Sequence, residues 1–447
     1  MEKNKNTKKI LTSTSLFLLL MGIVSLLSDM THEGASSITG GYLSFLGASS
    51  TVIGFVSGLG TFIGYGLRIL TGYIADKKKN YWTMTIIGYA IDLLFIPLLA
   101  IVPQNGWVLA CGFIVAGKIG NAIKKPAKDT MVSFAGSNNG QGKNFAILEF
   151  VDQIGAVLGP VMLFIMTLIT KSINLSKYHT YIVCFAILLL PALACIGLLF
   201  FAKHKFPHPE NYEKESIKNS NKFNKTYILY IIAICLYAFG FINYPLIETH
   251  IANLNIISTT YIPLLYALAM FIDAFSALIF GTLYDKYGFV TLVISTLLST
   301  TFSLFVFTSN NIALIIIGVI LWGIGMGAQE SIMKAGIASL TSKENRSKGY
   351  GVFQIFFGAS MLVGGSLAGF LHDNSISLMI IVSILFQFLS VIIFIITDLS
   401  NKKRIKMLQS LSSNTDINIE NNTINSDITQ QVENSQNQKD DTENNLE

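Results

Sequence analysis

The sequence predicts an all-α integral membrane protein with twelve transmembrane helices in two pseudo-symmetric six-helix bundles. Three observations support this prediction. Only 13% of the 447 residues are charged and 51% are hydrophobic, whereas soluble proteins carry about 25% charged residues. Long apolar segments recur along the whole chain, and motifs of its first half return in its second half. This composition excludes a soluble multidomain enzyme.

Each apolar segment is long enough to cross a bilayer. A transmembrane helix needs about 20 mainly apolar residues, and lipid tolerates only a backbone whose hydrogen bonds close internally. The predicted spans, in chain order, are 11–40, 50–74, 82–102, 107–123, 145–170, 181–202, 227–248, 259–283, 290–307, 312–335, 350–371 and 376–396.

A long polar stretch divides these spans six and six. We therefore expect an N-terminal bundle at 1–203, a cytoplasmic linker at 204–226 and a C-terminal bundle at 227–406. The last segment, 407–447, is rich in Asn, Gln, Asp and Glu and has few large apolar residues. Such a segment cannot bury enough surface to fold alone, so we expect a disordered cytoplasmic tail.

The basic residues predict which side each loop faces, because Lys and Arg of short loops stay in the cytoplasm. With the N-terminus inside, only Lys171 and Lys177 face outward, Arg68 and Lys118 lie at membrane depth, and all other Lys and Arg lie inside. We expect a multi-pass protein of the cell membrane with both termini cytoplasmic. The basic start could also be a secretory signal, but no convincing cleavage site follows it.

A short motif follows the second span and returns after the eighth. Glycines let helices approach closely, and an Asp can stabilise the N-terminus of a neighbouring helix. The basic residues of the motif keep the loop on the cytoplasmic side. We expect a conformational clasp here, the alternative being only a positively charged loop. The two copies consist of Gly72, Asp76 and Lys77, and of Gly281, Asp285, Lys286 and Gly288.

These motifs resemble the loop signature of the major facilitator superfamily, Gly-x-x-x-Asp-Arg-x-Gly-Arg, although Lys79 and Asn80 depart from it. The likeness extends from the first span to the twelfth. It implies a transporter that works by alternating access, with Asp76 near the start of the eleventh helix and Asp285 near the start of the fifth. Segments 118–129 and 325–335 resemble an uncharacterised prokaryotic branch of the superfamily.

The fifth span contains Gly155, Gly159 and Pro160. They resemble the core of a signature that this superfamily associates with antiporters. Glycines four residues apart are also a general device for close helix packing, and Pro is common in membrane helices. Both interpretations stay open. Lys118 stands where the family's fourth-helix signature usually has Arg, so a role in proton coupling carries over only weakly.

Ionisable residues at membrane depth are the candidates for proton coupling and ion pairing. Each costs roughly 2.5–3.5 kcal/mol at the bilayer centre unless it has a partner or water, so together they must line an interior. Proton coupling requires a carboxyl group that burial allows to take up a proton near neutral pH. Asp29, Glu33 and Asp152 are the first choices. The full set is Asp29, Glu33, Arg68, Asp92, Lys118, Glu149, Asp152, Asp273 and Glu330.

Depth along the helices, at about 1.5 Å per residue, predicts pairs within this set. Arg68 and Asp92 should lie at one depth on adjoining helices. Lys118 should lie near Glu149 and Asp152. Glu330 precedes Lys334 by one helical turn, so these two can also pair.

The first helix carries a polar stripe of Asp29, His32, Glu33, Ser36 and Gly40 at helical spacing, which predicts a face toward water or substrate. In the alternative, the helix ends near Asp29 and the stripe is an outer loop. Candidate substrate contacts on this and later helices are His32, Tyr237, Tyr244, Glu248, Tyr266, Trp322, Gln329 and Gln354. Core packing is the alternative for the aromatic members.

Carboxylates, aromatic rings and Met together suit an amphipathic or cationic organic molecule. Pro245 should bend the seventh helix, which then gates the outside. We expect a secondary active transporter of a small organic solute, with proton-coupled efflux favoured over uptake. A non-transporting receptor or scaffold is the alternative from another class.

The sequence predicts no enzyme, no cofactor and no metal. Cys111, Cys184, Cys195 and Cys235 lie in apolar runs without ligand spacing, and no phosphate-binding loop is complete. Expected partners are a small-molecule substrate, protons and the lipid bilayer, without nucleic acid, and we expect a monomer.

Overall fold

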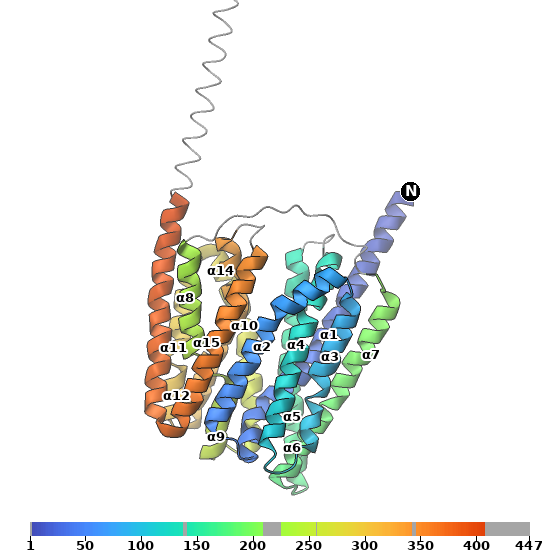
Figure 1. The fold of residues 1–447 in the computed structure, drawn as a ribbon. Coiled ribbons are helices and arrows are strands. Elements are labelled where there is room, and N and C mark those ends of the chain that lie inside the picture. Colours follow the sequence, from blue (N-terminus) through green and yellow to red (C-terminus); the bar gives the residue numbers. More distant parts are fainter. Residues whose placement is uncertain (1, 137–140, 209–224, 256, 342–345, 407–447) are drawn as a thin grey trace, which may run out of the picture. The chain divides into compact units, whose positions relative to one another are not determined.

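In a computed structural model, residues 2–136, 141–208, 225–255, 257–341 and 346–406 are described, and every regular element in these ranges is helical. The helices are α1 Glu2–Phe45, α2 Ser50–Lys78, α3 Tyr81–Leu94, η1 Pro97–Ile101, α4 Trp107–Gly136, α5 Gln141–Ser172, α6 Lys177–Ile187, α7 Leu189–Lys205, α8 Lys225–Gly240, α9 Tyr244–Leu254, η3 Thr259–Tyr261, α10 Ile262–Tyr287, α11 Phe289–Thr300, α12 Phe302–Thr308, α13 Ile312–Gly327, η4 Ala328–Ile332, α14 Met333–Leu340, α15 Arg346–Asn374 and a last helix Ile376–Lys406 (Figure 1).

Within the described residues, 11 helices are long and apolar enough to cross a membrane. The region predicted as the tenth span contributes a shorter apolar helix, Ile312–Gly327. It continues through a π-helical turn, Ala328–Ile332, into Met333–Leu340. The all-helical membrane class is therefore confirmed, while the exact number of spans stays a prediction.

The chain up to Ile395 forms one compact unit, and Ile396 begins a second. The described part of the second unit, 396–406, is helical, and Lys402 Nζ lies 2.7 Å from Asp398 Oδ2 one turn earlier. Most of the predicted linker and all of the predicted tail lie outside the described residues. Below, the N-terminal half means residues up to 205 and the C-terminal half residues 225–395.

The helices pack closely where glycine replaces a larger side chain. A Cβ at Gly159 of α5 would lie 2.2 Å from the carbonyl oxygen of Met30 on α1. Between the halves, a Cβ at Gly54 of α2 would lie 2.2 Å from the carbonyl oxygen of Gly365 on α15. Figure 1 shows α2 and α15 side by side. The fifth-helix glycines thus have a packing role, whatever else they do.

The seventh predicted span is broken, as its proline suggested. The helix α8 ends at Gly240, and α9 begins at Tyr244 with Pro245 in its first turn. Proline donates no backbone hydrogen bond and suits the first turn of a helix. The indole Nε1 of Trp322 donates to the freed carbonyl oxygen of Ile242 at 2.9 Å, so the break is satisfied by a side chain.

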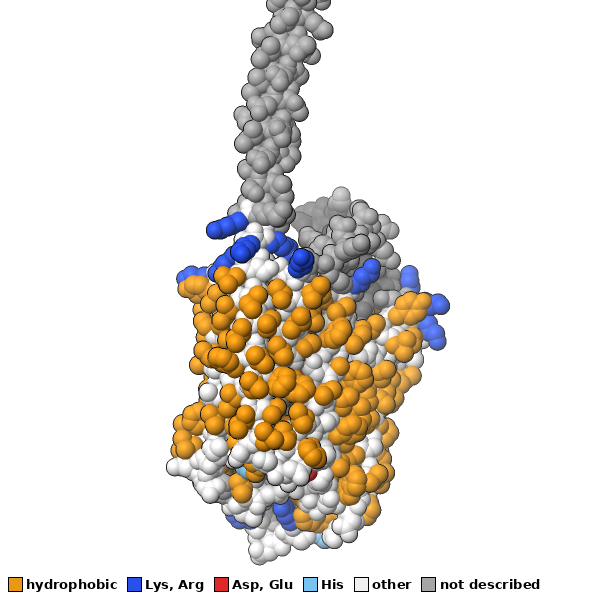
Figure 2. All heavy atoms as spheres, turned by 60° about the vertical axis from the view of Figure 1, so that its left-hand side comes forward, with side chains coloured by type: hydrophobic (Ala, Val, Ile, Leu, Met, Phe, Trp, Pro, Cys, Tyr) orange, Lys and Arg blue, Asp and Glu red, His pale blue; other side chains and the backbone are white. Residues whose placement is uncertain are grey.

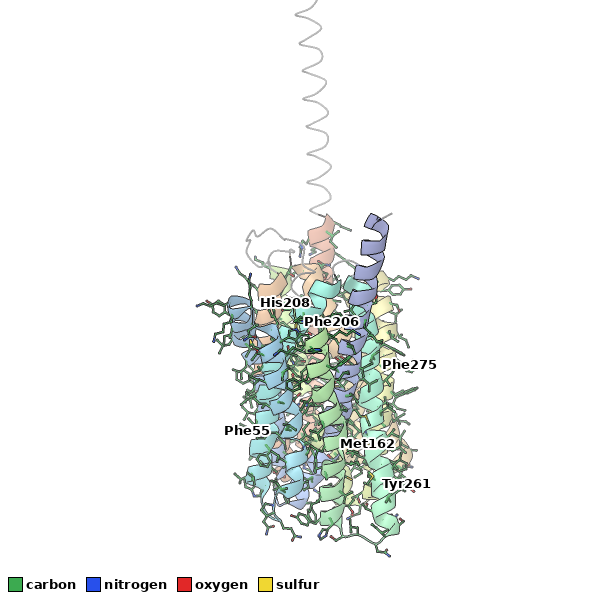
Figure 3. All side chains as sticks on the ribbon, turned by 90° about the vertical axis from the view of Figure 1, so that its right-hand side faces the viewer. Phe55, Met162, Phe206, His208, Tyr261 and Phe275 are labelled. Carbon is green, nitrogen blue, oxygen red and sulfur yellow. The ribbon has the colours of Figure 1, made fainter. Side chains whose placement is uncertain are left out.

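Large apolar side chains face outward along the helices, and Figure 2 shows a band of them on one face. Phe55 on α2 and Phe275 on α10 project from the helices in Figure 3 and are 46% and 51% exposed. Soluble proteins rarely expose contiguous apolar surface of this extent. Lipid therefore suits this surface better than water does.

Candidate functional site

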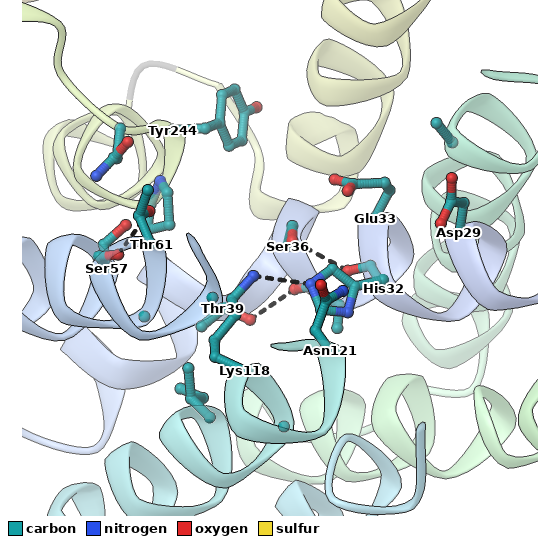
Figure 4. Close-up of a pocket in the computed structure, with 18 of the residues that line it drawn as sticks. Asp29, His32, Glu33, Ser36, Thr39, Ser57, Thr61, Lys118, Asn121 and Tyr244 are labelled. Atoms are coloured by element: carbon teal, nitrogen blue, oxygen red, sulfur yellow. Dashed lines mark hydrogen bonds between the residues drawn. The ribbon is translucent and has the colours of Figure 1, made fainter. Parts of the chain in front are cut away.

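A cavity of about 410 Å³ lies between the two halves, at the depth where the intramembrane charges were predicted. Helices α1, α2, α4, α5, α9, α10, α13 and α15 all contribute side chains to its lining. Figure 4 shows its centre, with the polar face of α1 opposite α4. Of the predicted site residues, those that line it are Asp29, His32, Glu33, Arg68, Lys118, Asp152, Tyr244, Tyr266, Asp273 and Trp322.

The polar stripe of α1 faces this cavity because the helix runs without interruption to Phe45. Asp29, His32, Glu33 and Ser36 all line the cavity, as positions three and four apart on one helical face should. The alternative, a helix that ends near Asp29 and a solvated outer loop, is wrong. The fifth member of the stripe, Gly40, packs instead against Pro245 of α9.

A basic wall is formed by α2 and α4. The Nζ atom of Lys118 lies 2.8 Å from Nε2 of His32 (Figure 4). Arg68 Nη2 donates to Asn121 Oδ1 at 3.1 Å, and the guanidinium lies 4.6 Å from the ring centre of Tyr65. This wall therefore offers two cations and an amide to the cavity.

A buried ion pair supports the wall from behind. Asp92 on α3 is fully buried, and its Oδ2 lies 2.5 Å from Nζ of Lys124 on α4. The other carboxylate oxygen lies 3.4 Å from Nδ1 of His32. The predicted pair of Arg68 with Asp92 is thus wrong, since Asp92 is taken by Lys124. Depth arithmetic carries no information on the rotation of each helix about its axis, which decides the partner.

An aromatic and acidic wall comes from the C-terminal half. Tyr266 Oη donates to Glu33 Oε2 at 2.5 Å, and Gln153 Nε2 donates to Asp273 Oδ2 at 3.3 Å. Both bonds cross between the halves. The rings of Tyr244 and Tyr266 lie 4.3 Å apart, and the ring of Trp322 lies 5.4 Å from that of Tyr244.

The cavity is closed on one side, the end of the helices where α1 finishes and α2 starts, called here the Phe45 end. There Ser44 Oγ donates to Asn253 Oδ1 at 3.2 Å, between α1 and α9. Asp373 of α15 accepts from the backbone N–H groups of Ser50 and Thr51 at 3.0 and 2.7 Å. Toward the opposite end, called here the Lys78 end, the lining reaches the exposed Lys334.

Glu248 was predicted as a substrate contact but lies at the closed side. It is 1% exposed, and its Oε2 accepts from the backbone N–H of Gly40 at 2.6 Å. It lines a second cavity of about 260 Å³ together with Tyr181. Glu248 therefore ties α9 to α1.

Two other predicted substrate contacts, Tyr237 and Gln354, do not line the large cavity. Tyr237 is buried, and its Oη donates to the carbonyl oxygen of Gly325 at 3.1 Å. Gln354 is half-buried on α15 and is absent from the described lining. The side chains of Asp76, Glu149, Gln329 and Glu330 lie outside the described residues, and so do the pairs predicted for Glu149 and Glu330.

The loop motifs lie at the Lys78 end. A Cβ at Gly72 would meet Pro126 of α4 at 3.5 Å, and Gly288 has a φ of +61°, in the left-handed region that favours glycine. Asp285 and Lys286 are exposed at the end of α10. Lys77 is exposed at the end of α2, and Gly281 is half-buried within α10. The predicted clasp stays a prediction.

Sequence reasoning missed part of the basic wall. Asn121, Lys124, Lys125 and Lys128 line the cavity, whereas the predicted fourth span stopped at residue 123. The missed signal is spacing. Lys118, Asn121, either of Lys124 and Lys125, and Lys128 are three or four positions apart, the repeat of a helical face. The helix α4 in fact continues to Gly136.

Comparison with known proteins gives three kinds of match. A family model described as "Major Facilitator Superfamily" matches residues 229–423. An uncharacterised protein of Mycobacterium bovis is 35% identical over 84% of this chain and 91% of its own length. An uncharacterised MFS-type transporter of Methanocaldococcus jannaschii is 28% identical over 80% of this chain and 88% of its own.

Among solved structures, the nucleoside transporter NupG superimposes with a TM-score of 0.65 at 14% identity. The match covers 85% of this chain and 98% of that one. At this level of identity, the likeness shows a shared fold alone.

Proposed function

The chain belongs to the Major Facilitator Superfamily and is a membrane transporter, and on that premise we propose that it carries a small organic solute across the cell membrane by alternating access, in exchange for protons. The observation that carries this proposal is the charged cavity between the two halves, closed at the Phe45 end. Transporters of this architecture hold their substrate near the bilayer midplane at the interface of their repeats.

We propose twelve spans in two six-helix bundles. The tenth span would be Ile312–Gly327 with its helical continuation to Leu340. The distribution of Lys and Arg favours cytoplasmic termini, so the Phe45 end would face outward and the cavity would be reached from the cytoplasm. The mean hydropathy of +0.55 is consistent with such a bundle.

Alternating access requires contacts between the halves that can break and re-form. At the Phe45 end these contacts are a few hydrogen bonds, among them Ser44 with Asn253 and Asp373 with Thr51. Each bond of this kind contributes about 0.5–3 kcal/mol. A closure built from such bonds and from close glycine contacts can open at a modest cost.

Coupling to protons would use carboxyl groups of the cavity. Glu33 is the first candidate, because it accepts a hydrogen bond from Tyr266 of the other half at 2.5 Å. A proton on Glu33 would remove the charge that strengthens this bond and would so change the preference between the two open forms. Asp29 and Asp152, which line the same cavity, are the next candidates.

Flux measurements in proteoliposomes test the proposal. A panel of radiolabelled organic solutes is offered to vesicles with an acidic or an alkaline lumen. Exchange against protons predicts accumulation in the acidic lumen, whereas co-transport with protons predicts accumulation in the alkaline lumen. If no solute of a broad panel moves in either case, a receptor or scaffold role is favoured instead.

Variants test the coupling residues in the same assay. Glu33→Gln and Asp29→Asn should abolish accumulation driven by the pH gradient and leave solute counterflow intact. Asp129→Asn, a carboxylate of α4 that does not line the cavity, is the matched control and should accumulate solute normally. Gradient-driven accumulation in both Glu33→Gln and Asp29→Asn would overturn the coupling assignment.

A further inference from the structure

The described lining of the large cavity carries more cations than carboxylates. Six Lys and Arg side chains line it, against four carboxylates. The cations are Arg68, Lys118, Lys124, Lys125, Lys128 and Lys334, and the carboxylates are Asp29, Glu33, Asp152 and Asp273. One cation, Lys124, is neutralised from behind by Asp92.

Neither cation of the central wall makes a direct ion pair with the described protein side chains, and Glu33 and Asp92 act on Lys118 only at longer range. Among the described side chains, no carboxylate forms an ion pair with Arg68 or Lys118, whose recorded contacts are Asn121, Tyr65 and His32. The Nε atom of Arg68 is buried without a hydrogen-bond partner among those residues. A half-buried guanidinium and ammonium at membrane depth are costly unless an anion meets them.

Two of the four carboxylates that line the cavity are already engaged in hydrogen bonds between the halves. Glu33 accepts from Tyr266, and Asp273 accepts from Gln153. A cationic solute would have to displace these bonds, whereas an anion would meet donors that lack an ionic partner. Of the two solutes expected from the sequence, an amphipathic or a cationic molecule, this contrast disfavours the cationic one.

Apolar surface lies next to the guanidinium. The ring of Tyr65, under Arg68, packs edge-on against Phe357 of α15 with centroids 5.5 Å apart. Met361, one turn further along α15, also lines the cavity. An aromatic or aliphatic body could rest here while its charged group reaches the basic wall.

We propose that the cavity binds an organic anion, whose carboxylate, phosphate or sulfonate group contacts Arg68 and Lys118 and whose apolar body packs against Tyr65 and Phe357. Arginine suits this role because its planar donors match two oxygens of such a group at once. This assignment rests on the proposed transport function. A soluble organic anion and an anionic lipid headgroup share this chemistry, and the test below separates them.

The sign of the potential in the cavity can be measured without knowing the solute. Thr61 lines the cavity two turns before Arg68 on α2, and Thr61→Cys is placed in a chain whose four native cysteines are replaced. Its rate of modification by an anionic methanethiosulfonate reagent (the ethylsulfonate) is compared with that of a cationic one (the ethyltrimethylammonium). Asn310→Cys, on an exposed loop, gives the reference ratio.

We expect the anionic reagent to be favoured at the Thr61→Cys thiol by about tenfold relative to the reference, as a few unit charges within roughly 10 Å would produce. Arg68→Gln and Lys118→Gln should each reduce this preference severalfold, whereas Arg68→Lys, which keeps the charge, should retain it. Ser57→Ala, at a neutral side chain of α2 that also lines the cavity, should leave it nearly unchanged. Size-exclusion profiles and the reference ratio of the Asn310→Cys chain identify any variant that has not folded.

Two protection arms complete the test. The anion 4-phenylbutyrate should protect the Thr61→Cys thiol in phosphatidylcholine nanodiscs, and 4-phenylbutylamine should not. Protection that instead requires phosphatidylglycerol in the nanodisc would assign the site to a lipid headgroup and would still support an anion site. A preference for the cationic reagent, or protection by the amine alone, would overturn the proposal. Anion protection without any solute flux would leave the binding site standing and refute only the transport function.

Discussion

Closure of the Phe45 end depends on a backbone contact at Gly40. A Cβ on Gly40 would lie 2.0 Å from the carbonyl oxygen of Pro245, a separation that no real methyl group tolerates. Because α1 and α9 belong to different halves, the proposed alternating access predicts that Gly40→Ala obstructs only the form in which this end is closed. The variant should therefore favour the form that is open at the Phe45 end.

The size of the effect follows from the contact. Overpacking a close contact costs typically 1–3 kcal/mol, and any retreat of α9 also weakens the bond from Gly40 N–H to Glu248, now 2.6 Å long. Since about 1.4 kcal/mol is a factor of ten in an equilibrium, we expect the ratio of closed to open molecules to fall roughly 5- to 150-fold.

A matched control exists within the N-terminal half. A Cβ on Gly159 would lie 2.2 Å from the carbonyl oxygen of Met30, a clash of similar severity between α5 and α1. Both helices belong to one half, so the clash persists in either form. Gly159→Ala should lower thermal stability without changing the conformational equilibrium.

Distances between spin labels measure the outcome. One pair, at Gln104 and Asn310, reports on the Phe45 end, and a second pair, at Lys79 and Tyr287, reports on the opposite end; all four side chains are exposed. Gly40→Ala should lengthen the first distance and shorten the second. Unchanged distance distributions at both ends, in a variant that folds normally, would refute the reasoning.

Three further predictions follow from contacts in the site. Removing one partner of the buried pair, by Asp92→Asn or Lys124→Met, should lower the free energy of unfolding by about 3–5 kcal/mol and the melting temperature by many degrees. The double variant should recover part of this loss. Equal losses in the two single variants and the double variant would contradict the prediction. Tyr266→Phe removes the hydroxyl group that donates a hydrogen bond to Glu33. It should lower the melting temperature by several degrees, because hydrogen bonds to charged groups contribute about 1.5–3 kcal/mol to stability. An unchanged melting temperature would show that this bond does not stabilise the fold. Asp373→Ala removes the carboxylate that accepts from the backbone N–H groups at the start of α2. The spin-label distance at the Phe45 end should then be longer. A distance equal to that of the unsubstituted chain would contradict this prediction.

The sequence was sufficient for the all-helical membrane class and for the cavity face of α1. Apolar length and periodicity are local properties, so the membrane helices and the stripe at Asp29, His32 and Glu33 could be read directly. The break before Tyr244 was also foreseeable, because Pro245 has a fixed backbone chemistry.

The partners of the charges could not be predicted in the same way. Sequence gives the depth of a residue in a helix but not how neighbouring helices are rotated against each other. Asp92 was therefore paired with Arg68 rather than with Lys124. Lys124 itself was assigned to a loop because a run of lysines resembles a cytoplasmic loop when its helical spacing is ignored.

The most direct test of the account is to hold the Phe45 end closed and to measure flux. In the chain without native cysteines, Ser44→Cys on α1 and Asn253→Cys on α9 replace two side chains whose Oγ and Oδ1 atoms lie 3.2 Å apart. A short, reducible bis-methanethiosulfonate then cross-links the two cysteines in proteoliposomes. Alternating access predicts that flux of the solute identified in the panel stops when the pair is joined and returns when the link is reduced. Undiminished flux through fully cross-linked protein would contradict the account.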